Sequence, residues 1–170
     1  EFDVSAISDE DASAETLAEN AESGDAVGIT ASASDADGTT NKVTYSLTSD
    51  DDGNFAIDED TGVVSTTRSL NHEAGETRTI EVEATSADGS SKSETFNITV
   101  NDINEAPVIE SGTTGTVFEN ANPTKVIYDV DATDVDGDKL TYSHSGTDAG
   151  QVTIDQDNGE IRLKSSADFE

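Results

Sequence analysis

The chain has 170 residues, with 38 acidic and eight basic side chains, and its formal net charge is −30. This charge excludes the nucleic-acid backbone and anionic membrane surfaces as default partners, because both are themselves negative. The absence of cysteine excludes disulfides and thiolate metal sites, and no apolar run approaches the ~18 residues of a membrane-spanning helix. Only 32% of the residues are apolar. They alternate along short Val/Ile/Thr-rich runs, which indicates strands separated by Asp/Gly turns rather than disorder.

Residues 1–13 are small and acidic, and we interpret them as a linker that precedes the first domain. We expect the whole segment to be a piece of a longer protein. Runs with period-two patterning follow at residues 16–20, 26–34, 43–47, 55–58, 63–65, 79–86 and 95–100. Seven strands with this patterning fit a Greek-key β-sandwich, which we place at residues 1–105.

Residues 106–170 repeat the first unit with a period of about 97–100 residues. The matching segments are 117–121 with 17–21, 134–137 with 35–38, 140–143 with 43–46, and 154–159 with 57–62. The second unit carries no counterparts of the strands at 79–86 and 95–100. The sequence therefore predicts an all-β fold of tandem sandwiches whose second domain is truncated.

The joint between the two units is rich in oxygen ligands. Asp102, Asn104 and Glu105 lie within four positions, and Pro107 follows, through which a central strand cannot continue. Hard cations such as Ca²⁺ take six to eight oxygen ligands from carboxylates, amides and carbonyls. The joint is thus either a calcium site or a polar linker whose acids are only solvated, and the heptapeptide alone leaves both interpretations open.

A set of short motifs runs through the first unit, and several of them recur in the same order in the second. In the first unit the motifs stand at Glu19, at Asp35 and Asp37, and at residues 45–47, 55–63, 70–73, 82–89 and 102–107. Each motif is common by itself, but their order and spacing, found twice, are specific. The pattern resembles cadherin repeats, and more closely the bacterial cadherin-like repeats of large surface adhesins.

The resemblance implies Ca²⁺ between consecutive domains. The implied ligands are Glu19, Asn71, Glu73, Asp102, Asn104, Glu105, Asp134 and Asp136 at the interdomain joint, with Asp35 and Asp37 at an amino-terminal joint. The sequence departs from the family pattern in four places. Asn71 replaces an aspartate, and the 102–107 linker is one residue short with a glutamate in place of its second aspartate. Ser86 stands where an aspartate is usual, and the second unit lacks the region that would correspond to Ser86. Residues 35–38 and 134–137 could instead be ordinary acidic turns that bind no metal.

The implied function is calcium-stiffened adhesion at a bacterial surface, as in a biofilm, with a homophilic or heterophilic cell-surface partner. The implied location is extracellular or at the cell surface. A second interpretation is a calcium-dependent module that binds polysaccharide, although few aromatic residues lie outside the apolar pattern. A third is an accessory fragment of an enzyme. The two histidines, His72 and His144, lie in no nucleophile motif, so we expect no catalysis, no nucleic-acid partner and no membrane insertion by this segment.

Overall fold

The computed structural model describes residues 3–36 and 41–167, which form two compact units, Glu1–Ile103 and Asn104–Glu170. The regular elements of the described residues are β-strands and one 3₁₀ turn, η1 (Ala149–Gln151). No helix in these residues is long and apolar enough to span a membrane. The all-β prediction is confirmed.

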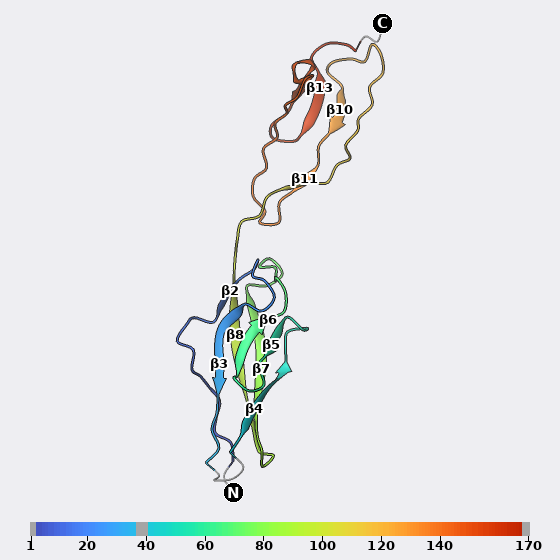
Figure 1. Cartoon of the computed structure of the whole chain (residues 1–170). Coiled ribbons are helices and arrows are strands. Elements are labelled where there is room, and N and C mark those ends of the chain that lie inside the picture. Colours follow the sequence, from blue (N-terminus) through green and yellow to red (C-terminus); the bar gives the residue numbers. More distant parts are fainter. Residues whose placement is uncertain (1–2, 37–40, 168–170) are drawn as a thin grey trace. The chain divides into compact units, whose positions relative to one another are not determined.

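The first unit consists of two four-stranded sheets (Figure 1). One has the strand order β1-β3-β6-β5 and the other β2-β8-β7-β4. The strands are β1 (Ser8–Asp9), β2 (Thr16–Ala18), β3 (Ala26–Ser32), β4 (Val43–Ser49), β5 (Phe55–Ile57), β6 (Val63–Thr66), β7 (Thr77–Ser86) and β8 (Ser91–Asn101). All pairs are antiparallel except β2 with β8, which is parallel. This is the predicted Greek-key sandwich.

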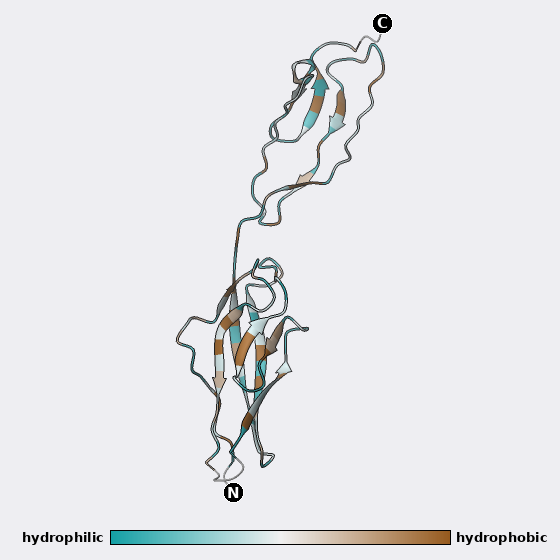
Figure 2. Ribbon diagram, in the orientation of Figure 1, coloured by the Kyte–Doolittle hydropathy of each residue, from teal (hydrophilic) through white to brown (hydrophobic). Residues whose placement is uncertain are grey.

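The core of the first unit follows from the period-two patterning, since alternate residues of a strand face the opposite sheet. Apolar and polar residues alternate in this way along the strands in Figure 2. The fully buried side chains include Val27 and Ile29 of β3, Val64 of β6, Ile80 and Val82 of β7, and Ile98 and Val100 of β8. Each such side chain contributes about 1.5–3 kcal/mol relative to leaving it in water. The long hairpin β7–β8 supplies several of these buried side chains.

The amino-terminal segment differs from the expected linker. Val4 and Ile7 are only 2% and 7% exposed and belong to the core. Ser8 pairs with Ser32, so that β1 forms the edge of a sheet. Burial of two isolated apolar residues in an acidic stretch explains the difference, because such a pair has no periodicity from which a strand could be predicted.

The second unit contains shorter strands and little buried surface. Its strands are β9 (Val108–Ile109), β10 (Val126–Asp129), β11 (Ala132–Thr133), β12 (Val152–Ile154) and β13 (Glu160–Leu163). They form a three-stranded sheet, β10-β13-β12, and a pair, β11-β9. Gly159 is the one buried residue among the described residues of this unit. Apolar side chains of the described part of this unit, such as Val108 and Ile109, are therefore exposed.

Equivalent backbone hydrogen bonds show that both units follow one plan. Ala31 N–H donates to Gly62 O at 2.9 Å, and Val130 N–H donates to Gly159 O at 3.2 Å. Both glycines have positive φ, +71° and +78°, and a Cβ on either would collide with the carbonyl oxygen of Ala31 or Val130. Glycine is therefore required here by conformation and by space.

We expect Gly62→Ala to destabilise the first unit more than Gly89→Ala. Gly89 also has positive φ, +93°, but a Cβ there meets open space. Its substitution should cost about 1–2 kcal/mol for left-handed strain, whereas the overpacked Gly62 site should lose a further ~1–3 kcal/mol. Urea denaturation followed by the NMR signals of β7 measures both, and equal losses would contradict the repeated glycine contact.

Candidate metal centre

A buried glutamate organises the end of the first unit at which β8 leaves it. Glu19 directly follows β2 and is 4% exposed. Its Oε2 accepts a hydrogen bond from His72 N–H and its Oε1 accepts one from Ile103 N–H, both at 2.8 Å. A carboxylate oxygen has more than one acceptor site, so these two bonds orient the group without using all its lone pairs.

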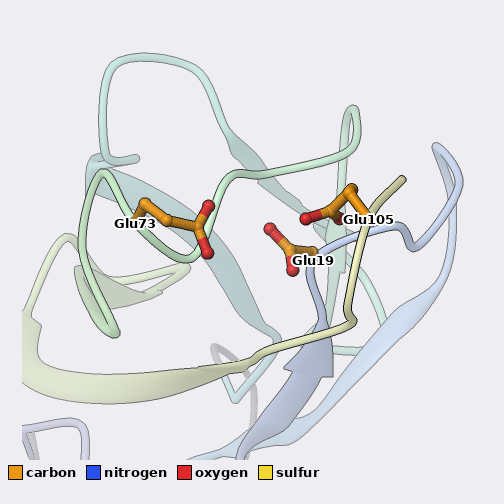
Figure 3. Close-up of side chains that lie close together, drawn as sticks. All are labelled: Glu19, Glu73 and Glu105. Atoms are coloured by element: carbon orange, nitrogen blue, oxygen red, sulfur yellow. The ribbon is translucent and has the colours of Figure 1, made fainter. Parts of the chain in front are cut away.

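Two further carboxylates of the first unit lie at this end, one beside Glu19 and the other beside Glu73. Oxygens of Glu19 and Glu73 lie within 4.8 Å of each other, and so do oxygens of Glu73 and Asp102. Figure 3 shows the carboxylates of Glu19 and Glu73 turned toward the same space. Within the described residues, no lysine or arginine pairs with Glu73 or Asp102. The end of this unit therefore holds concentrated negative charge.

His72 lies among these acids and adds a positively polarised group. Its Nδ1 lies 2.7 Å from Val100 O, so Nδ1 carries the proton in this contact. The pKa of His72 is raised, first by this hydrogen bond and then by the charges of Asp102 and Glu73. The ring thus anchors the turn that carries Glu73 to the end of β8.

In the second unit, the loop after β11 holds the other predicted acids. Asp136 Oδ2 accepts a hydrogen bond from Glu105 N–H at 2.7 Å. Asp134 Oδ1 accepts bonds from Asp136 N–H at 3.1 Å and from Asp138 N–H at 3.3 Å. Asp136 Oδ1 is buried and has no hydrogen-bond partner among the residues described. A buried carboxylate oxygen without a partner is costly, and a hard cation would satisfy it.

The remaining predicted ligands have local partners. Asn71 Oδ1 accepts Ala74 N–H at 2.5 Å, and Asn104 Nδ2 donates to Glu105 O at 2.8 Å. The amide oxygen of Asn71 therefore has one lone pair left after this bond within its own turn, whereas an aspartate would also retain a second oxygen. The other predicted ligands at this joint are carboxylates. Such a set of oxygen donors suits Ca²⁺, which prefers oxygen ligands.

At the amino-terminal end of the first unit, Asp35 is buried and accepts a hydrogen bond from the Ser86 hydroxyl. Asp37, predicted with it, lies outside the described residues. The hydrogen bonds of Ser86 to Asp35 and of His72 to Val100 O could not be predicted from the sequence. The sequence shows Ser86 only as a departure from the family pattern. For His72, the one feature that pointed to the site is its position next to Glu73 in the chain.

Comparison with family models gives two matches. Residues 14–101 match the model described as Cadherin domain, and residues 104–170 match the model described as Bacterial Ig domain. Protocadherin Fat 1 of Homo sapiens is 33% identical over 138 residues, which cover 76% of this chain and 3% of that protein. Protocadherin-11 X-linked of Sus scrofa is 34% identical over 131 residues, covering 71% and 12%. The chain thus spans a small fraction of these curated relatives.

Solved structures agree with the fold. The mouse cadherin-23 EC22-24 structure superposes with a TM-score of 0.65 and 25% identity, covering 98% of this chain and 55% of that chain. The structure of protocadherin gamma B2 extracellular cadherin domains 1-5 gives a TM-score of 0.69 at 19% identity, covering 99% and 34%. The second likeness supports the tandem sandwich fold alone.

We expect Glu19→Ala to destabilise the first unit even in EDTA. The substitution leaves His72 N–H and Ile103 N–H without their acceptor, at a cost of about 1–3 kcal/mol for each donor that stays buried. Exposed Glu22 provides the control, since Glu22→Ala should change stability by less than about 0.5 kcal/mol. Urea denaturation in EDTA measures both, and equal stability of the two variants would show that Glu19 acts only through a metal.

Proposed function

This chain belongs to the cadherin domain family, and from that premise we propose that it is a calcium-binding adhesion module of an extracellular protein. In this proposal Ca²⁺ ions at the 102–107 linker stiffen consecutive domains so that an array of them can reach a cell-surface partner. The match of residues 104–170 to a bacterial Ig domain supports placing the parent protein among secreted or surface-anchored bacterial adhesins.

The observation that carries the proposal is the arrangement of Glu19, Glu73 and Asp102 in the first unit. Glu19 is held by two backbone N–H groups, and Glu73 lies within 4.8 Å of each of the other two acids. In the second unit, the buried Oδ1 of Asp136 adds an oxygen in need of a partner. The proposed ligands are Glu19, Asn71, Glu73, Asp102, Asn104, Glu105, Asp134 and Asp136, with Asp35 and Asp37 for an amino-terminal ion.

Electrostatics explains how such ions would act. Two unit charges about 5 Å apart repel by roughly 3 kcal/mol at an effective dielectric of about 20. Without cations, the acids of the linker region oppose a fixed geometry. With Ca²⁺ the same oxygens become ligands, so that binding energy adds to folding stability and restricts the linker.

An alternative function as a polysaccharide-binding module has less support. Polysaccharide sites commonly present exposed aromatic rings. Among the described residues, Phe118 is the one aromatic side chain that is largely exposed, at 82%, whereas Tyr45 and Phe55 are in the core. Cadherin domains are adhesion modules rather than enzymes, and we therefore propose a homophilic or heterophilic protein partner on a cell surface.

Calcium should raise the thermal unfolding midpoint of the 170-residue chain. Extracellular modules bind Ca²⁺ with a Kd of about 10⁻⁴–10⁻³ M, and a site adds about 2.7 kcal/mol of stability at a hundred times its Kd. Thermal unfolding in EDTA and in a Ca²⁺ series measures the effect. Mg²⁺ is the control and should substitute poorly, because it demands tight octahedral geometry. Equal midpoints in EDTA and Ca²⁺ would contradict calcium binding.

Glu73→Ala should weaken calcium binding by at least about tenfold, equivalent to ~1.4 kcal/mol, because Glu73 lies beside both Glu19 and Asp102. The matched control is Glu59→Ala, which removes an equally charged, exposed side chain from the turn between β5 and β6. Isothermal titration of both variants compares them. A comparable loss in the two would mean that Ca²⁺ responds to net charge and not to this set of ligands.

A further inference from the structure

An arginine occupies an inward position at the start of β7. Arg78 alternates with Ile80 and Val82, which are fully buried, and it pairs across the sheet with buried Ile98. The period-two patterning of the strand would place an apolar residue here. A guanidinium at the margin of a core loses hydration and needs polar partners in return. The groups that surround Arg78 therefore indicate what its charge does.

The guanidinium lies against the turn at residues 71–75, which carries Glu73. Nη2 of Arg78 donates a hydrogen bond to Asn71 O at 3.1 Å. A Cβ added at Gly75 would lie 3.7 Å from both Cζ and Nη1 of Arg78, so the planar group is in contact with the backbone of the turn. In the described part of the chain, no ion pair joins Arg78 to the Glu73 carboxylate. Arg78 therefore contacts the backbone that carries Glu73 rather than the carboxylate itself.

The guanidinium also faces a second acidic turn, at residues 50–54. Arg78 Nε lies 3.9 Å from Asp51 Oδ2, and the two side chains are only 18% and 24% exposed, so that water and salt screen this ion pair weakly. Asn54 Nδ2 donates to the same Asp51 oxygen at 2.8 Å, and Arg68 Nε donates to Asn54 Oδ1 at 2.6 Å. These bonds fix the Asp51 carboxylate, so the turn at 50–54 supports Arg78 without help from an ion.

We propose that Arg78 is a positioning residue for calcium binding, which holds the turn at 71–75 against the turn at 50–54 and thereby presets the place of Glu73. This inference rests on the proposed calcium function. Glu19 also restrains the turn that carries Glu73, but Glu19 is itself a proposed ligand, whereas a guanidinium has no acceptor atom for a cation. A turn that is held before the ion arrives loses less conformational entropy on binding, which raises the affinity.

A positive charge beside a calcium site also has an electrostatic effect, and its sign is opposite. If Arg78 acted only through its charge, its removal would strengthen Ca²⁺ binding, because like charges repel. The positioning role predicts weaker binding instead. Asp51, at 3.9 Å, offsets much of the positive charge, so we expect the loss of positioning to dominate.

The test compares Arg78→Met with Arg68→Met by isothermal titration of the 170-residue chain with CaCl₂. Both guanidinium groups contact residues of the 50–54 turn, and Arg78 contacts the 71–75 turn in addition. Methionine keeps an apolar stem at each position. Residues that hold a metal ligand in place typically change metal affinity by ~10–100-fold, and because Glu73 lies on an exposed turn we expect the low end, about 5- to 10-fold weaker binding for Arg78→Met and less than about twofold for Arg68→Met.

A double variant tests whether the effect passes through Glu73. Arg78→Met combined with Glu73→Ala should bind Ca²⁺ no more weakly than Glu73→Ala alone, because the position of an absent carboxylate no longer matters. A further loss in the double variant would show that Arg78 acts by stabilising the whole unit, and it would overturn the positioning role.

A calcium-free measurement separates this inference from the proposed function. In EDTA, Ala74 N–H donates to Asn71 Oδ1 and Gly75 N–H donates to His72 O, and both amides should exchange at least about tenfold faster in Arg78→Met than in the unsubstituted chain. Unchanged exchange would overturn the inference, as would equal or tighter Ca²⁺ binding by Arg78→Met when the unsubstituted chain binds. Absence of Ca²⁺ binding by the unsubstituted chain would overturn the proposed function itself, and the inference with it.

Discussion

The carboxylate of Glu19 is the constraint on which the acidic end of the first unit, the proposed metal centre, depends. It joins three segments that are distant in sequence, because it follows β2 and accepts hydrogen bonds from His72 N–H and Ile103 N–H. A buried charge is tolerated where hydrogen bonds satisfy it. These bonds also fix the turn that carries Glu73 and the exit of β8 that carries Asp102. The fold thereby concentrates like charges at this end of the unit, and the proposed Ca²⁺ would offset their repulsion.

The same strand plan has different outcomes in the two units. In the first unit, the hairpin β7–β8 covers the opposite sheet and provides β4 with its partner. In the second, the counterpart of β4 keeps its hydrogen bond to Gln156 but stays outside any sheet of the described residues. Local turns, such as those at Gly62 and Gly159, form in both. A turn therefore depends on nearby residues, whereas burial depends on the covering hairpin.

Much of this architecture could be predicted from the sequence, because period-two patterning and paired Asp/Gly turns are local signals. The inward positions of Ile80, Val82 and Ile98 follow from alternation alone. The burial of Val4 and Ile7 could not be predicted, since two apolar residues in an acidic stretch form no pattern. Every residue except proline has a backbone N–H, so residue type does not indicate which N–H groups will bind a side chain. The hydrogen bond from Ile103 N–H to Glu19 could therefore be found only in the structure. The ligand set itself remains a proposal from family resemblance and from these contacts.

An NMR titration of backbone amides with Ca²⁺ tests the central claim most directly. The amides of His72 and Ile103 donate to Glu19, and that of Glu105 donates to Asp136. If these carboxylates bind the ion, the three amide signals should shift together and saturate at one Ca²⁺ concentration, while the signals of the acidic turn at Asp51 and Asp52 stay unchanged. Shifts that grow without saturation, or that are as large at Asp51 and Asp52 as at Ile103, would show that Ca²⁺ only screens the surface charge.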